Sequence, residues 1–100
     1  MASARDVMEA AAQLSARLDG RASATAELLL AAARDLGFHV TGDHRIGEAD
    51  VAALLGMTPG ALANKRREGK APASYALPAK GHRVTYRVAD VAAWIEARRD

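Results

Sequence analysis

The chain has 100 residues, half of them apolar, and a formal net charge of +2. Much of the apolar half is alanine and only four residues are aromatic, so size and composition suit one domain with a thin, helix-rich core, to which a partner chain could add burial. The lack of cysteine excludes disulfides, thiolate metal sites and cysteine nucleophiles, and without a signal peptide or a membrane-length apolar run we expect a cytoplasmic protein.

The charge is unevenly distributed along the chain. Residues 1–44 contain four basic and six acidic side chains, whereas residues 45–100 contain ten basic and six acidic ones. Such asymmetry indicates either a surface for a polyanion in the second half or a solvated face balanced by the acidic first half. Between residues 65 and 87, Glu68 is the one acid among the basic residues Lys65, Arg66, Arg67, Lys70, Lys80, Arg83 and Arg87.

Two helices are expected in the N-terminal third. The first covers residues 4–18 and ends at Asp19-Gly20, since glycine can take the left-handed cap conformation. The second covers about residues 24–36, with Ser23 as N-cap and Gly37 as C-terminal cap. Their apolar faces need a partner, so we expect a homodimer, with packing on the rest of the chain as the alternative. These faces contain Val7, Ala11, Leu14 and Leu18 in the first helix, and Leu28, Leu29, Leu30, Ala32, Ala33 and Leu36 in the second.

A short strand at residues 38–40 and a turn at residues 42–43 lead to two further helices. The first covers residues 48–55 and turns an apolar face inward, after which Gly56 ends it. The second covers about residues 58–68, with Thr58 as N-cap and Pro59 at its first position, and Gly69 ends it. Leu62 is its main apolar residue. A helix this polar is stable only when it is packed at one point and exposed elsewhere.

The C-terminal part is expected to form a β-hairpin and a last helix. The β-prone segments 75–77 and 84–86 are joined through a turn at residues 80–82, and the helix covers residues 89–98. Trp94 and Tyr86 should lie in the core, the tyrosine with its hydroxyl at the surface. Because the histidines are scattered and no catalytic motif is present, we expect no enzyme activity, no metal, no cofactor and no small-molecule ligand.

The segment from residue 48 to 69 has the spacing of a helix-turn-helix. Ala52, Gly56 and Leu62 stand four and six residues apart, which supplies a small contact residue, a turn glycine and an apolar anchor. Further matching segments are LANKRREGKAP at residues 62–72, VTYR at residues 84–87 and DVAAWI at residues 90–95. With these, residues 46–99 resemble the winged helix-turn-helix family of phage excisionases, small AlpA-type regulators and the DNA-binding domain of MerR proteins.

The resemblance implies a mainly α fold with a small β-hairpin wing, preceded by the two N-terminal helices. Residues 45–100 would form the DNA-binding domain, and residues 1–44 a helical segment that dimerises or extends the core. Lys65 departs from the family, which usually has tryptophan there, and the wing at residues 73–83 is longer than usual. Such a wing could reach the minor groove or flanking phosphates, and the alternative is a disordered loop.

The function implied is sequence-specific binding of double-stranded DNA, as a transcriptional regulator or an excisionase of phage or mobile-element type. Two alternatives remain open. One is a packaging component like the small terminase subunit of phages, although there the winged domain usually precedes a long assembly helix. The other is a protein-interaction module that does not bind DNA.

The expected DNA contacts come from the second helix of the motif and from the wing. Thr58 caps the helix or binds a phosphate, Ala61 contacts a thymine methyl group, and Asn64 reads a base. We expect Lys65 and one arginine of the Arg66-Arg67 pair to reach DNA, the other pairing with Glu68 or solvent. The full set is Thr58, Pro59, Ala61, Asn64, Lys65, Arg66, Arg67, Lys70, Lys80, His82, Arg83 and Arg87.

Overall fold

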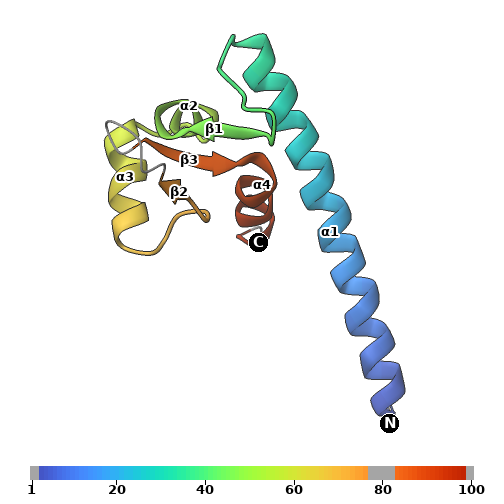
Figure 1. Cartoon of the computed structure of the whole chain (residues 1–100). Helices are drawn as coiled ribbons and strands as arrows, with labels where there is room; N and C mark the ends of the chain where they lie inside the picture. Colours follow the sequence, from blue (N-terminus) through green and yellow to red (C-terminus); the bar gives the residue numbers. More distant parts are fainter. Residues whose placement is uncertain (1–2, 77–82, 99–100) are drawn as a thin grey trace.

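The computed structural model describes residues 3–76 and 83–98. Within these residues the fold is mainly helical, with one small antiparallel sheet of three strands in the order β1-β3-β2 (Figure 1). None of the described helices is long and apolar enough to cross a bilayer. The elements are α1 (Ala4–Asp35), β1 (Arg45–Gly47), α2 (Glu48–Leu54), α3 (Pro59–Arg67), β2 (Tyr75–Ala76), β3 (Val84–Arg87) and α4 (Val88–Ala97).

The N-terminal third forms one helix, so the expected break at Asp19-Gly20 is wrong. Ser3 caps α1: its side chain accepts a hydrogen bond from the backbone of Asp6, and the Asp6 carboxylate accepts one in return. Gly20 and Ser23 lie inside the helix. A glycine there costs roughly 1 kcal/mol relative to alanine, and the alanine-rich sequence around it favours the helix enough to absorb that cost. Gly37, with φ of +74°, ends α1 as expected.

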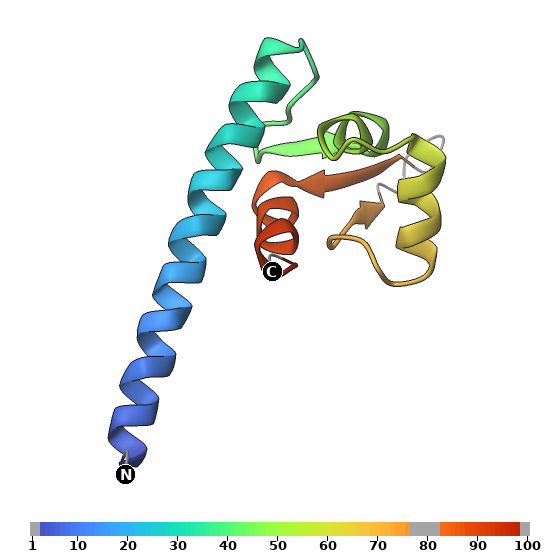
Figure 2. The same cartoon turned by 180° about the vertical axis from the view of Figure 1, so that it is seen from behind.

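Only the C-terminal half of α1 packs on the rest of the molecule. Residues 3–21 are all exposed, and this part of the helix extends away from the other elements (Figures 1 and 2). Beyond it, α1 packs along α4, and Ala33 is fully buried. The predicted apolar face divides accordingly: Leu29 and Leu30 pack against the core, whereas Leu28 is 71 % and Leu36 62 % exposed.

The sheet contains a strand that the sequence pattern did not indicate. Strand β1 pairs with β3 so that Ile46 lies opposite Tyr86, while β2 pairs with the other edge of β3, with Tyr75 opposite Thr85. The strand expected at residues 38–40 is reduced to Val40, which forms an isolated bridge with Ile46. Three residues are too few to show an alternating pattern, which explains why β1 was missed.

One small core joins the sheet and all four helices. Its largest fully buried side chains are Tyr86, Ile46, Leu62 and Val51. Trp94 does not belong to this cluster, contrary to expectation. It is half-buried, and the Arg98 guanidinium lies 4.2 Å from the centre of its ring. The exposed arginine therefore covers the indole that the core does not enclose.

Candidate nucleic-acid interface

Helix α3 is fixed at both of its ends by its own backbone geometry. At its start, the Thr58 side chain accepts a hydrogen bond of 3.1 Å from the Ala61 N–H, and Pro59 occupies the first turn, as predicted. At its end, Gly69 has φ of +72°, and the Lys70 N–H donates to the Lys65 carbonyl at 2.8 Å. These bonds satisfy backbone groups that a short helix would otherwise leave unpaired.

In the turn between α2 and α3, Gly56 occupies the position predicted for a turn glycine. Gly56 has φ of +73°, a backbone conformation that side chains with a Cβ rarely adopt. Next to it, the Met57 N–H donates to the carbonyl of Ala52 at 2.8 Å. Ala52 and Leu62 are both fully buried. The two short helices are therefore joined by a tight turn, and α3 contacts the core through one leucine.

A carboxylate on α2 adds a second attachment for α3. Glu48 Oε2 accepts a hydrogen bond of 2.7 Å from Arg66 Nε, and Oε1 accepts one of 3.3 Å from Arg66 Nη2. The Tyr86 hydroxyl donates to the same Oε2 at 2.6 Å. The expectation that this hydroxyl lies at the surface is therefore wrong. The acid that pairs with Arg66 is Glu48 rather than Glu68, which pairs instead with Lys70 at 3.5 Å.

The surroundings of Glu48 change the pKa values of the groups that meet there. Burial by itself raises the pKa of the Glu48 carboxyl, but the hydrogen bonds from Arg66 and Tyr86 outweigh it, so the pKa lies below its ordinary value. The carboxylate raises the pKa of Arg66. Burial, followed by the bond to Glu48, raises the pKa of the Tyr86 hydroxyl. At neutral pH the carboxylate and guanidinium are thus charged and the phenol is protonated.

Two polar side chains of α3 point away from the core. Asn64 and Arg67 are exposed and lie on the side of the helix opposite Leu62, and Arg67 Nη1 donates to Asn64 Oδ1 at 3.1 Å. Lys65 is half-buried and makes no ion pair within the described residues. We call the exposed side opposite Leu62 the outer face of α3; it comprises Gly60, Ala61, Asn64 and Arg67, and Lys65 lies outside it, near the Leu62 side.

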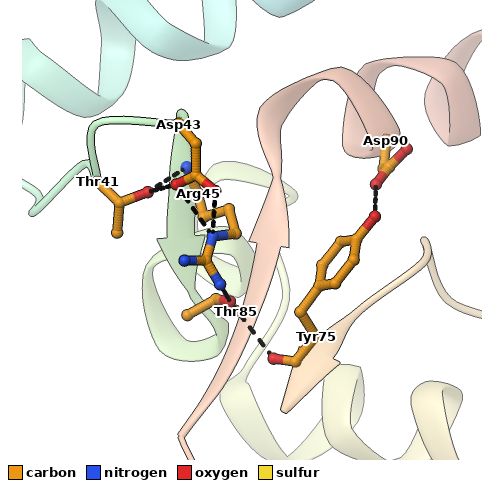
Figure 3. A network of polar contacts seen from close by, with 6 residues as sticks. All are labelled: Thr41, Asp43, Arg45, Tyr75, Thr85 and Asp90. Atoms are coloured by element: carbon orange, nitrogen blue, oxygen red, sulfur yellow. Dashed lines mark hydrogen bonds and ion pairs between the residues drawn. The ribbon is translucent and has the colours of Figure 1, made fainter. Parts of the chain in front are cut away.

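A polar network connects β2 and β3 with each other and with the elements next to them (Figure 3). The Tyr75 hydroxyl donates to Asp90 Oδ2 of α4 at 3.2 Å, and the Thr85 hydroxyl donates to the Tyr75 carbonyl at 3.3 Å. On the opposite side, Arg45 reaches Thr85 at 3.4 Å and forms an ion pair of 2.9 Å with Asp43. Since its members lie on different elements, local sequence pattern could not have identified this network.

The basic residues of the β segment differ in how the structure presents them. Arg83 and Arg87 are exposed, and the guanidinium of Arg87 lies 4.9 Å from the centre of the Tyr75 ring. Lys80 and His82, which were expected to contact DNA, lie outside the described residues. Arg83 shares an open hollow with Arg66 of α3, so the end of that helix and the start of β3 face the same space. Further residues lining the hollow include His39, Arg45, Glu48 and Asp50.

The polar side chains on the outer face of α3 are one amide and one guanidinium. Within residues 3–76 and 83–98 no group of three or more His, Cys, Asp or Glu side chains could hold a metal ion. The outer face of α3 offers amide and guanidinium groups that can bind base edges and phosphates. No protein family, no curated protein and no solved structure that was compared with this chain matches it.

Proposed function

We propose that this chain binds double-stranded DNA as a winged helix-turn-helix protein. In this proposal α2 and α3 form the helix-turn-helix, α3 enters the major groove, and the segment from β2 to β3 is the wing. The observation that carries the proposal is the way α3 is presented. One leucine and one ion pair attach it to the body, and its outer face carries Asn64 and Arg67, with the half-buried Lys65 beside it.

The side chains of the outer face suit separate parts of a duplex. The Asn64 amide can form two hydrogen bonds with adenine, and the methyl group of Ala61 can contact a thymine methyl group. Lys65 and Arg67 are the cations of α3 best placed for phosphates, because the charge of Arg66 is already paired with Glu48. Arg66 then orients the helix, which refines its expected role as a direct contact.

The wing would add contacts outside the major groove. Arg83 and Arg87 are exposed at the two ends of β3, and neither forms an ion pair within the described residues. The network through Tyr75, Thr85 and Arg45 keeps this strand in register with its neighbours. A wing on a fixed strand can bind backbone phosphates on one side of α3. The resemblance of the sequence supports a role in regulation or excision for a phage or mobile element.

Fluorescence anisotropy with two duplexes tests the proposal. The DNA upstream of the chain's own gene and a scrambled duplex of equal length are titrated at about 50 and 200 mM salt. We expect tighter binding to the first duplex and weaker binding to both at the higher salt concentration. Arg67→Ala should lower the log–log salt slope by about 0.9, the value for one phosphate contact.

A charge-matched control separates a local contact from general attraction. Arg5→Ala removes the same charge from the exposed N-terminal half of α1 and should leave affinity and salt slope unchanged. If both variants lost the same affinity, α3 would not be the binding element. If the protein bound neither duplex at low salt, the proposal would be wrong and the alternative of a protein-interaction module would stand.

A further inference from the structure

We propose that the exposed N-terminal half of α1 is a dimerisation helix that pairs antiparallel with the same segment of a second copy. The segment is residues 4–21, called here the projecting half of α1. This inference does not depend on DNA binding, because it concerns a part of the molecule remote from α3. It also narrows the expected dimer contact from the whole N-terminal third to one half of one helix.

The projecting half carries an apolar stripe that is exposed along its length and meets α4 only at its last member, Leu18. Val7, Leu14 and Leu18 are 59 %, 52 % and 39 % exposed. With Ala11 between the first two, successive positions of the stripe are four, three and four residues apart. This is the spacing of a two-helix seam, in which side chains of one helix fit between those of another. An unsupported helix of this length is only marginally stable in water, so a partner along the stripe would stabilise it.

The stripe continues a helix–helix contact that already exists within the chain. Thr25 stands seven residues after Leu18, and its hydroxyl donates to Glu96 Oε1 of α4 at 2.7 Å. Leu18 and Ala22 line a groove together with Ala93 and Ala97 of α4. The same side of α1 therefore packs on α4 from about residue 18 onward. Before that residue, this side of α1 is exposed. A helix from a second copy would extend this packing to the whole of α1.

Charge favours an antiparallel arrangement of the two helices. Arg21 occupies the next position of the repeat after Leu18. In a parallel pair the two Arg21 side chains would meet across the seam and repel each other. In an antiparallel pair with Leu18 level with Val7, each Arg21 lies level with Ala4 of the other helix, so the two Arg21 side chains stand at opposite ends of the seam and do not meet.

The length of the seam sets the expected strength of the dimer. Residues 4–21 form about 27 Å of helix, and a pair of helices this short buries less than the roughly 800 Å² per partner of a standard interface. We therefore expect a micromolar dissociation constant. Sedimentation velocity of the full chain should show a shift from monomer to dimer as its concentration rises from about 1 µM to several hundred. A monomer throughout this range would overturn the proposal.

Two matched substitutions on one helix test the stripe itself. Leu14→Glu places a charge in the seam and should weaken association at least about tenfold. Ala16→Glu adds the same charge two residues on, on the opposite side of the helix, and should leave the dimer intact. The near-ultraviolet circular dichroism of Trp94 verifies that both variants keep the fold of the body. Equal association of the two variants would contradict the assigned face.

The direction of pairing can be tested because the chain has no cysteine. Val7→Cys and Leu18→Cys are made as separate proteins of different tag length, mixed, and oxidised. An antiparallel pair brings position 7 of one copy beside position 18 of the other, so we expect disulfides between the two variants. Disulfides formed only within each variant would indicate parallel pairing and would overturn the arrangement proposed here.

Discussion

Glu48 is the polar side chain on which the attachment of α3 most depends. It is 18 % exposed, and it accepts hydrogen bonds from Arg66 of α3 and from the buried Tyr86 of β3. A carboxylate in such a place connects three elements through two oxygens. Removing its charge would leave one neutral carbonyl oxygen to accept from both a guanidinium and a phenol, which costs more than the loss of an exposed ion pair.

Glu48→Gln should destabilise the fold by about 1–3 kcal/mol at neutral pH. The pKa of Glu48 is lowered below 4.5 in the folded state, so its contribution is present above that pH and is lost as the pH falls through the folded-state pKa. Urea unfolding between about pH 7 and pH 3 should therefore show a flatter acid dependence for the variant. Parallel curves for variant and wild type would show that Glu48 does not carry this dependence.

The wild-type acid dependence should contain a second, smaller part from Asp43. Hydrogen bonds from Thr41 and Arg45 lower the pKa of this exposed carboxyl. Its contribution to stability likewise disappears as the pH falls. Asp43→Asn is therefore the control in the same experiment, and we expect it to flatten the curve less than Glu48→Gln does, because Asp43 is more exposed.

At the outer face of α3, Asn64 is the side chain expected to distinguish bases. Asn64→Ala should reduce the difference in affinity between the preferred duplex and single-base variants by about 1–3 kcal/mol. Arg83→Ala is the comparison and should weaken all duplexes alike, because a phosphate contact carries no sequence information. Competition anisotropy with a set of duplexes measures both. The division of roles would be wrong if Arg83→Ala changed the order of preference.

Among the elements, two glycines with open space around them should respond oppositely to the same substitution. At both Gly56 and Gly20 an added Cβ would meet no atom within 4 Å, so no clash enters the comparison. Gly56→Ala forces a left-handed conformation on alanine and should destabilise the fold by about 1–2 kcal/mol. Gly20→Ala lies in a helix and should increase helix stability by about 0.5–1 kcal/mol.

Denaturant unfolding measures the first glycine variant and helical circular dichroism the second. Helicity is the sensitive measure for Gly20→Ala because residue 20 lies in the exposed part of α1. A loss of helicity at Gly20, or an unchanged stability at Gly56, would contradict the role assigned to each backbone position.

The sequence predicted the structure best where neighbouring residues alone determine the backbone conformation. The start of α3 follows from Thr58-Pro59, its end from Gly69, and its contact with the core from Leu62, the main apolar residue of that helix. Each of these depends on residues within one or two turns. The outer face of α3 follows from the same helix period.

The predictions that failed depended on distant partners or on competition between weak signals. At Gly20 the helix continues because the helix propensity of the neighbouring residues outweighs the unfavourable propensity of a single glycine. The Glu48–Tyr86 bond joins residues 38 positions apart, so nothing near either residue indicates it. The short strand β1 exists because β3 pairs with it, and its sequence alone does not favour a strand.

At the scale of the whole molecule, the chain consists of a body and the projecting half of α1. No residue between 3 and 21 is buried, whereas Ala33 belongs to the central core. Deletion of residues 1–20 should therefore change the free energy of unfolding of the body by less than about 1 kcal/mol, within the range of surface changes. The same deletion should abolish self-association in sedimentation velocity. A body that unfolds on truncation would mean that the projecting half supports it.

Because α1 is attached to the body only near its C-terminal end, a small rotation there moves its N-terminal end by a larger distance. Its pivot lies where Ala33 is buried and where Thr25 is bonded to α4, and its free arm runs from there to Ala4. With a rise of about 1.5 Å per residue, a tilt of about 5° at Ala33 swings the tip by roughly 4 Å. In the proposed dimer, small changes in how α1 packs on α4 would thus change the position of one body relative to the other.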